Sequence, residues 1–450
     1  MKRKLRFSLS TTQLILLSFL LLILLGSLLL ALPISAADGK AVPYVDALFT
    51  ATTATCVTGL VTLPTVSAWS LFGQIVILFL IQAGGLGVIT ILSGLMLALH
   101  RKMKLADRLL LQDAFNLNTL SGLADFVKKV ILGTLLIEGI GALLYMTVFV
   151  PDFGARGIWI SIFNSVSAFC NAGIDIIAED SLCAYALNPI INTVTCLLII
   201  LGGIGYIVWW DVLRVVKSGR PKKLRSLTLH SKIAISATLL LILAGALAFF
   251  VFEYDNPLTM KDYSLPQKLG ASLFQSVTTR TAGFATIPQQ NLTNASAITS
   301  ILLMFIGGSP VGTAGGVKTV TVVILAASAI CTIKNQGEVT LFHRSISRQA
   351  VSKSVAVVGT SFFIVFCSTL LLAFTTEADA LDILYETVSA AATVGLSRNL
   401  TPFLSTAGKL IVAATMYLGR VGPISLAIAF LTKKESNNAV KNPVEAISVG

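Results

Sequence analysis

Apolar runs long enough to cross a bilayer recur along the whole chain, and they limit its possible folds more than any other feature. A spanning helix needs about 20 predominantly apolar residues. Only 12% of the 450 residues are charged, against about a quarter in an ordinary soluble domain. The sequence therefore predicts an all-α integral membrane protein. The predicted spans cover residues 13–34, 70–99, 127–150, 190–216, 232–252, 297–333, 355–375 and 406–432.

The basic residues gather on one side of these spans. Five segments hold 24 of the 33 lysines and arginines: 2–6, 101–129, 214–232, 334–353 and the tail from Lys433. The segments on the other side hold few basic residues, among them Lys40, Arg156, Lys261 and Lys268. By the positive-inside rule we expect both termini in the cytoplasm. The net charge of +12 then follows from membrane topology, and no nucleic-acid partner is expected.

The first span, 13–34, follows a basic start and has no small-residue cleavage site after it, so we expect a retained helix rather than a signal peptide. Neither cysteines nor histidines predict a metal site or a disulfide framework. The three histidines fall in predicted cytoplasmic loops, and the cysteines are scattered, mostly in apolar segments, as small core residues. The cysteines are Cys56, Cys170, Cys183, Cys196, Cys331 and Cys367.

The eight spans form four pairs, and a shorter amphipathic stretch lies between the members of each pair. Each stretch carries one glycine followed by a large apolar residue. The glycines, Gly59, Gly173, Gly283 and Gly395, are 114, 110 and 112 residues apart. Such a period is the sequence signature of internal repeats. We expect four repeat units with boundaries at 1–99, 100–216, 217–333 and 334–450.

Two spans and a loop that enters and leaves by the same face give every unit the same orientation. Inverted-repeat transporters instead need an odd number of spans in each unit. The predicted fold is thus four parallel units of helix, re-entrant pore loop and helix. Eight transmembrane helices and four short pore helices would surround a central pseudo-fourfold pore.

The four short stretches have the chemistry of a cation filter. A pore helix that enters from outside directs the negative end of its dipole toward the membrane centre, and the returning segment can offer carbonyls in place of a water shell. Glycine accepts the positive φ that such a segment requires; the alternative is that these glycines are ordinary helix caps. The predicted filter residues are Thr55, Cys56, Val57, Thr58, Gly59, Cys170, Asn171, Ala172, Gly173, Arg280, Thr281, Ala282, Gly283, Ala392, Thr393, Val394 and Gly395.

The sixth span contains five glycines and a proline within residues 307–316. Glycine costs about 1 kcal/mol and proline about 3 kcal/mol in a helix interior, so we expect an intramembrane loop that gates the pore; a simple kink is the alternative. A phosphate-binding loop is excluded because Val317 interrupts the Gly-Lys pair, so no nucleotide is expected in this chain. The predicted gate comprises Gly307, Gly308, Ser309, Pro310, Val311, Gly312, Thr313, Ala314, Gly315, Gly316 and Arg420.

Charged residues within spans are expensive and usually face a partner or water. We expect Arg420 to bind carbonyls of the 307–316 loop and to form an electrostatic barrier, with an ion pair to Glu138 as the alternative. Arg280 is expected to brace its loop against an acid, and Lys318 to lie at the cytoplasmic mouth. Three acids after the second glycine either attract cations or form a solvated loop: Asp175, Glu179 and Asp180.

The loops and glycine-rich second spans together resemble the Trk/Ktr/HKT superfamily of potassium transporters, and within it the bacterial Ktr membrane subunit. The supporting motifs run from Gln82 to Gly87, Leu201 to Gly205, Gly307 to Thr319 and Gly419 to Pro423. The resemblance implies potassium uptake across a bacterial plasma membrane, with Na⁺ as a possible activator. In this family a first-loop glycine, here Gly59, goes with potassium preference. The carbonyls expected to hold K⁺ belong to Val57, Thr58, Ala172, Ala282 and Val394.

The resemblance also implies partners, namely a second copy of the chain and a cytoplasmic ring of nucleotide-binding RCK-type regulatory subunits. The basic loops 100–129 and 214–232 and the tail are the candidate docking surface, although positive-inside topology alone explains their charge. An intramembrane enzyme is excluded, because no catalytic grouping of residues occurs in the spans. A Na⁺-coupled K⁺ symporter with fixed stoichiometry stays open as the alternative.

Overall fold

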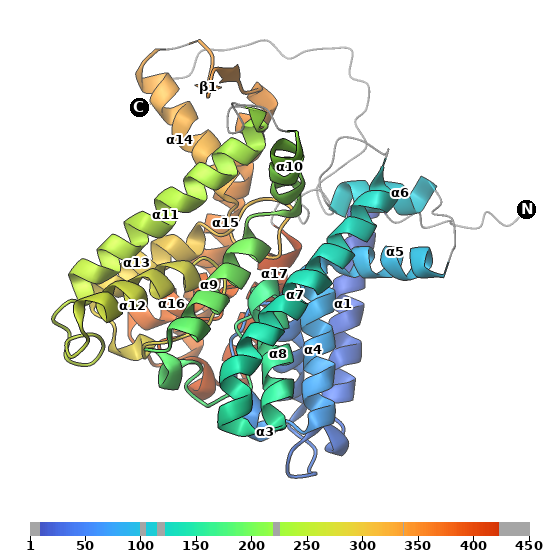
Figure 1. Ribbon diagram of the computed structural model, residues 1–450, viewed down its shortest axis with the longest axis vertical. Helices are drawn as coiled ribbons and strands as arrows, with labels where there is room; N and C mark the ends of the chain where they lie inside the picture. The colour runs from blue at the N-terminus through green and yellow to red at the C-terminus, as the bar shows by residue number, and fades with distance from the viewer. Residues whose placement is uncertain (1–9, 100–104, 115–121, 219–225, 336, 423–450) are drawn as a thin grey trace, which may run out of the picture.

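A computed structural model describes residues 10–99, 105–114, 122–218, 226–335 and 337–422, and this part of the chain is almost entirely helical (Figure 1). The first basic segment and the tail from Lys433 lie outside the described residues, as do parts of the other basic loops. One short hairpin, β1 (Thr340–Leu341) and β2 (Arg344–Ser345), is the only sheet described.

The helices fall into long outer helices, short inner helices and paired half-length helices. Four helices are long and apolar enough to cross a membrane: α1 (Thr11–Leu30), α7 (Leu123–Phe153), α11 (Leu229–Glu253) and α15 (Arg348–Thr375). The short inner helices are α2 (Tyr44–Cys56), α8 (Arg156–Cys170), α12 (Leu265–Thr278) and α16 (Ala380–Ala391). The others are α3 (Thr65–Ala68), α4 (Leu71–Leu86), α5 (Val88–Ala98), α6 (Leu105–Ala114), α9 (Pro189–Gly203), α10 (Tyr206–Lys217), α13 (Asn294–Phe305), α14 (Thr319–Ile333) and α17 (Thr406–Val421).

Two predicted continuous spans are wrong in detail, because the chain turns sharply inside them. The span 70–99 is divided into α4 and α5 with a bend of 94°, and the span 190–216 into α9 and α10 with a bend of 97°. The turns occur at Gly87 and Gly205, whose φ angles of 85° and 94° lie where other residues are strained. Counting each bent pair as one span, the described residues contain up to six spans rather than eight.

The sixth predicted span is interrupted, as its glycines and proline indicated. Helix α13 ends at Phe305 and α14 begins at Thr319, and the residues between them are not helical. The kink alternative is therefore wrong, because a kink would keep the helix on both sides of one residue. The eighth predicted span, 406–432, is described only as far as α17, and its remainder lies outside the described residues.

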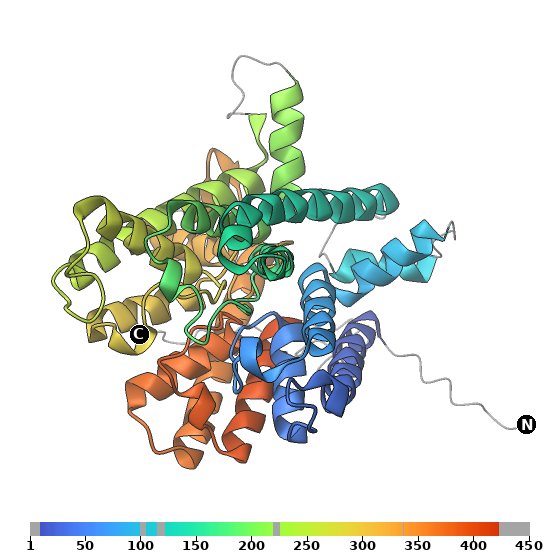
Figure 2. The same ribbon diagram turned by 60° about the horizontal axis from the view of Figure 1, so that its bottom comes forward.

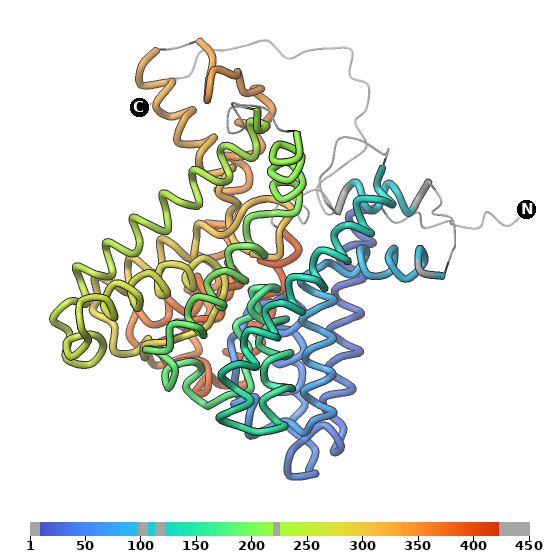
Figure 3. The backbone as a smooth tube through the Cα atoms, viewed as in Figure 1, coloured from blue at the N-terminus to red at the C-terminus, as the bar shows by residue number. Residues whose placement is uncertain are grey.

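The helices pack in a closed circle, and Figure 2 shows the blue, green, yellow and orange parts of the chain around a common centre. Figure 3 traces the same backbone as a tube in the view of Figure 1. The residues 1–99, 100–216, 217–333 and 334–450 are called the first to fourth quarters. Within each quarter the long helix contacts the short one: α1 with α2, α7 with α8, α11 with α12, and α15 with α16. Between quarters the contacts run in chain order, α4 with α8, α9 with α12, and α13 with α16, and then close from α17 back to α2. An ion pair between Lys409 and Asp46, 2.6 Å, also joins the last quarter to the first.

The outer face of this circle is apolar. Leu132 on α7, Leu240 on α11 and Phe374 on α15 are 66%, 68% and 91% exposed. An apolar surface of this kind needs a partner of similar polarity, and the acyl chains of a bilayer provide one. The polar and glycine-rich segments lie inside, at the ends of the short helices.

Candidate functional site

The four short inner helices end in segments with the same backbone pattern. A residue with left-handed φ comes two positions before each of the four regularly spaced glycines, and the glycine itself has positive φ. The paired φ angles are 56° and 101° for Val57 and Gly59, 59° and 64° for Asn171 and Gly173, 68° and 86° for Thr281 and Gly283, and 52° and 95° for Thr393 and Gly395. The sequence period of the glycines thus corresponds to four copies of one local structure.

The four glycines meet in a ring whose members touch in chain order. A methyl group placed on Gly173 would lie 2.5 Å from the carbonyl oxygen of Ala282, and one on Gly283 would lie 2.5 Å from that of Val394. Gly59 approaches the oxygen of Ala172 in the same way, and Gly395 closes the ring on that of Thr58. No side chain fits at any of the four positions, because the neighbour in each case is backbone. Four of the five carbonyls predicted from the sequence therefore lie at this ring.

Two hydroxyl groups brace the ring in the first and fourth quarters. The backbone N–H of Gly59 donates to Thr53 Oγ1 at 2.9 Å, and that of Gly395 donates to Ser389 Oγ at 3.1 Å. Each hydroxyl lies six residues before its glycine. The sequence patterns did not single out these residues, although a hydroxyl six positions before three of the four glycines was a readable signal. In the second quarter this residue is Ser167, whose buried hydroxyl has no hydrogen-bond partner among the described residues. In the third quarter this position is Val277, which offers no hydroxyl.

A second set of glycines lets α4, α9 and α17 approach the backbone at the ends of the short inner helices. A methyl group on Gly84, Gly202 or Gly419 would fall onto the carbonyl oxygen of Thr55, Phe169 or Ala391, respectively. Each of these carbonyls belongs to the residue four positions before a ring glycine. The quoted glycine motifs of the second spans are therefore close-approach positions, and they place helix ends directly behind the ring in three quarters.

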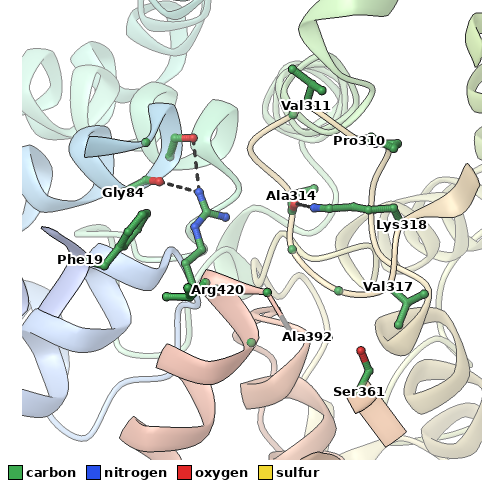
Figure 4. Close-up of a pocket in the computed structure, with 18 of the residues that line it drawn as sticks. Phe19, Gly84, Pro310, Val311, Ala314, Val317, Lys318, Ser361, Ala392 and Arg420 are labelled. Atoms are coloured by element: carbon green, nitrogen blue, oxygen red, sulfur yellow. Dashed lines mark hydrogen bonds between the residues drawn. The ribbon is translucent and has the colours of Figure 1, made fainter. Parts of the chain in front are cut away.

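The third quarter has the segment 306–318 in this place instead of a helix. Its two ends are held together, because the N–H of Gly307 donates to Val317 O at 3.0 Å and that of Val317 donates to Phe305 O at 3.1 Å. The N–H of Thr319 adds a bond to Gly308 O at 3.0 Å. The segment is thus a closed loop whose base is a short parallel bridge. It contributes to the wall of a cavity of about 420 Å³ beside the ring (Figure 4).

The loop binds to the break between α9 and α10. The N–H groups of Ser309 and Thr313 donate to the oxygens of Gly203 and Gly202, at 2.8 and 3.1 Å, and the N–H of Tyr206 donates to Val311 O at 2.9 Å. The last carbonyls and first N–H groups of helices have no partner within their own helix. The bend at Gly205 therefore exposes the backbone groups that the loop requires.

Arg420 lies between the loop and the first quarter (Figure 4). Its guanidinium donates to Thr313 O at 2.7 Å and, through the other terminal nitrogen, to the oxygens of Gly84 and Gly85. The expected bond to a loop carbonyl is therefore present, and the alternative ion pair with Glu138 is not among the described interactions. Glu138 instead accepts hydrogen bonds from Gln82, 3.2 Å, and from the thiol of Cys170, 3.8 Å.

The other two cations in the predicted site also bind backbone oxygens. Arg280 donates to Thr238 O at 3.3 Å and to Gly307 O at 3.1 Å, so the expected acidic partner is wrong. The reason is that its buried side chain lies among carbonyls of the loop base and of α11. Lys318 lines the cavity and donates to Ala314 O at 2.6 Å within the loop.

The three acids after the second ring glycine have different surroundings. Glu179 is exposed and accepts a hydrogen bond from Ser67 of the first quarter at 3.3 Å, and Asp180 is also exposed. Asp175 is half-buried and accepts from the N–H of Ile177 at 3.3 Å. Burial raises the pKa of Asp175 to about 6. The carboxyl of Asp175 therefore changes its charge between about pH 5 and pH 7.

In the part of the chain that the structure describes, no three His, Cys, Asp or Glu side chains come close enough to share a metal ion. The polar atoms that gather at the glycine ring are backbone carbonyl oxygens, with hydroxyl oxygens beside them. Such oxygens replace the hydration shell of alkali cations in selective pores. Apolar spanning helices around a centre of this kind define an integral membrane protein of the cation-transport class.

Comparison with known families agrees with that class. The TrkH family, described as a cation transport protein, matches residues 3–442, and the chain belongs to this family. It is 39% identical to the Ktr system potassium uptake protein B of Bacillus subtilis over 94% of both chains. It is 38% identical to the potassium/sodium uptake protein NtpJ of Enterococcus hirae, over 100% of this chain and 99% of that one.

A solved structure has the same fold. The potassium transporter TrkH from Vibrio parahaemolyticus superposes with a TM-score of 0.75 at 17% sequence identity, covering 95% of this chain and 86% of that one. At this identity the likeness concerns the fold alone. The overall helical arrangement is therefore shared with that solved structure.

Proposed function

We propose that this chain is the membrane subunit of a potassium uptake system and conducts K⁺ through the centre of the glycine ring. The observation that carries the proposal is the closed ring itself, in which each glycine lies against a carbonyl of the next quarter. The potassium uptake named for the Bacillus subtilis and Enterococcus hirae relatives supports the choice of ion. Transport rather than catalysis agrees with the family assignment.

The proposed architecture is four parallel units around one axis, with the boundaries predicted from the sequence. Each unit contributes a long helix, a re-entrant short helix and a second span, which is bent or interrupted in three of the units. Contacts that run in chain order and close from α17 to α2 support a pseudo-fourfold axis. On this view the eight spans include α13 with α14, and α17 with the residues that follow it.

The proposed filter uses the carbonyls of Val57, Thr58, Ala172, Ala282 and Val394. The short helices α2, α8, α12 and α16 end at the ring, so the negative ends of their dipoles favour a cation there. No carboxylate lies at the four glycine positions. Selection by carbonyl oxygens therefore fits the chemistry better than selection by an acidic ring.

The loop 307–316 and Arg420 form the proposed gate. The loop lies behind the ring and is made mostly of small residues, and hydrogen bonds hold it to the second quarter and to Arg420 of the fourth. Backbone bonds of this kind can be exchanged for bonds to water when a loop moves. Arg420 adds a positive charge on the proposed ion path, which opposes cation passage while the loop is closed.

The coupling of transport to sodium has two forms. In the first, Na⁺ acts as an activator of a channel-like path; in the second, the protein is a Na⁺-coupled K⁺ symporter of fixed stoichiometry. The potassium/sodium uptake named for the Enterococcus hirae relative keeps the second form in view. The fourfold ring favours the first, because parallel units around one axis surround a continuous path.

We further propose that the chain works as a homodimer on a cytoplasmic ring of nucleotide-binding RCK-type subunits, in the plasma membrane with both termini in the cytoplasm. The word "system" in the names of the Ktr relatives supports a separate partner subunit. The basic loops 100–129 and 214–232, much of which lies outside the described residues, form the proposed docking surface together with the tail.

The decisive experiment measures K⁺ uptake in cells that lack their own potassium transporters, with and without a co-expressed regulatory subunit. The native chain should restore growth on low potassium. Gly59→Ser and Gly283→Ser should admit sodium, because a side chain at either position must displace a ring carbonyl. Deletion of residues 307–316 should raise the flux.

The matched control is Gly270→Ala, since Gly270 lies on the short helix α12 but a methyl group there meets no atom within 4 Å. This variant should transport like the native chain. If membrane-inserted native protein moves no K⁺ even with the regulatory subunit, the pore proposal fails. Uptake that saturates and strictly requires Na⁺ in a fixed ratio would instead support the symporter.

A further inference from the structure

Thr313 is the point at which the loop is tied to the rest of the molecule. The residue is fully buried, and each of its polar atoms has a partner. Its N–H donates to Gly202 O at 3.1 Å, its hydroxyl donates to Phe169 O at 3.0 Å, and its carbonyl accepts from Arg420 at 2.7 Å. Because Arg420 also holds Gly84 O, this one loop residue is linked to all four quarters.

The hydroxyl bond to Phe169 is the unusual member of this set, because it reaches the ring region rather than the helix break. Phe169 is the penultimate residue of the short helix α8, and Asn171 of the second ring segment follows two residues later. Carbonyls at the end of a helix have no acceptor role within that helix. A buried carbonyl that loses its only donor costs about as much as a hydrogen bond.

The path for this bond is kept open by a missing side chain. A methyl group on Gly202 would come within 2.7 Å of Thr313 Oγ1 and would fall onto Phe169 O. The hydroxyl therefore reaches the α8 carbonyl through the space that Gly202 leaves. The Thr313 hydroxyl thus joins the loop directly to the backbone at the end of α8, from which the second ring segment begins.

We propose that Thr313 is a positioning residue that couples the loop to the ring, so that loop position and ion discrimination change together. The inference rests on the proposed filter and gate and adds a connection between them. A second bond supports it, since the N–H of Gly315 donates to Thr281 Oγ1 of the third ring segment at 3.2 Å. Moving the loop away leaves Phe169 O and Thr281 Oγ1 without the groups that donate to them.

The same loop offers an internal control. The hydroxyl of Ser309 is also buried, but it pairs with Thr319 Oγ1 at 3.0 Å, at the base of the loop. Removing this hydroxyl weakens loop closure without touching the ring. Ser309→Ala and Thr313→Val therefore separate a loose loop from a loop that has lost its connection to the ring.

The test uses the full chain in proteoliposomes and measures K⁺ and Na⁺ fluxes under the same gradients. Thr313→Val removes the hydroxyl and nearly preserves shape. The loss of one hydrogen bond of about 1 kcal/mol corresponds to about a fivefold change. We expect a higher K⁺ flux and a K⁺-to-Na⁺ flux ratio lowered about fivefold. Thr313→Ser should restore both, and Ser309→Ala should raise the flux with a native ratio.

A native flux ratio in Thr313→Val, or an equal change in ratio in Ser309→Ala, would overturn the coupling. If the valine variant does not assemble, as judged by size-exclusion chromatography, Thr313→Ala removes the same hydroxyl without crowding and is measured in its place. The outcomes also separate the two proposals. If the native chain moves no K⁺, the proposed pore is wrong. If the native chain conducts and Thr313→Val keeps its flux ratio, only the proposed coupling is wrong.

Discussion

The second and third quarters both interrupt a span beside the ring, but they do so in opposite ways. Between α9 and α10 the break is confined to Ile204 and Gly205, and both flanking helices keep their ends close to it. Between α13 and α14 the chain leaves the helix from Ile306 to Lys318. The short break presents free backbone groups at two helix ends, and the long one supplies a loop that pairs with them.

The two breaks also differ in what holds the chain around them. Helix α10 is fixed by Asp211, which accepts hydrogen bonds at 2.9 Å from both the N–H and the hydroxyl of Thr228 at the start of α11. Within its own quarter the loop is held at its base, by Arg280 and by Thr281. Its position depends on bonds to the second quarter and to Arg420. The first three of the following four predictions test that dependence, and the fourth concerns Asp175.

The largest effect is expected from Gly202→Ala. The added methyl group would overlap the carbonyl oxygen of Phe169, and a backbone carbonyl cannot yield as a flexible side chain does. We expect loss of the assembled protein, measured as a monodisperse peak in fluorescence-detected size-exclusion chromatography, and loss of K⁺ uptake. Gly139→Ala, on α7 with no atom near its added methyl group, should behave like the native chain. Native-like behaviour of Gly202→Ala would contradict the close approach.

A smaller but still large effect is expected from Arg420→Gln. The guanidinium holds Thr313 in the loop and the carbonyls at Gly84 and Gly85, and hydrogen bonds to charged groups contribute about 1.5–3 kcal/mol each. We expect K⁺ influx to rise at least about tenfold in radiotracer assays. Arg420→Lys keeps the charge but reaches fewer carbonyls, so its K⁺ influx should lie between that of the native chain and that of Arg420→Gln. A fall in influx in both variants would show that Arg420 aids conduction.

Val311 offers a change of opposite sign. Its φ of 62° is unfavourable for a β-branched residue, so the closed loop is strained at this position while it accepts the bond from Tyr206. Val311→Gly relieves about 1–2 kcal/mol of this strain and should stabilise the closed loop. We expect a several-fold lower K⁺ flux than in Val311→Ala, which loses nearly the same side chain but keeps the strain. Equal fluxes in the two variants would exclude strain as a contribution to opening.

The smallest effect concerns the outer side, where the second quarter has Asp175 and the third has Ala285 at the corresponding distance from its glycine. The pKa of Asp175, raised by burial to about 6, means that its carboxyl is charged at pH 7.5 and mostly neutral at pH 5. The apparent KM for K⁺ should therefore rise about twofold as external pH falls, because a neutral group no longer attracts cations. Asp175→Asn should have the higher KM at both pH values, and Glu179→Gln should keep the native pH profile.

The sequence alone predicted most of the fold. Apolar runs located the long helices, and the period of Gly59, Gly173, Gly283 and Gly395 identified the segments that form the ring. Both signals are local, because span length and glycine spacing can be read along the chain. The interruption of the sixth span was readable for the same reason, since Pro310 and its neighbouring glycines oppose a helix.

What the sequence did not predict depends on contacts between distant segments. The bends at Gly87 and Gly205 were missed, because both lie in clusters of glycines, and nothing along the chain shows which glycine of a cluster takes the turn. The partners of Arg280 were predicted wrongly, because nothing local shows that Thr238 O and Gly307 O lie beside it. The role of Gly202 likewise emerges only when α8 and α9 are seen together.

The ring of glycines has a consequence for how this chain can diverge. Each ring glycine is in contact with a carbonyl of the following quarter, and the fourth returns to the first. A substitution in one quarter is therefore first felt in its successor, and a compensating change would have to be made there as well. Four segments of like structure are in this way prevented from drifting independently, whereas the outward-facing apolar side chains of the helices around them are free to vary.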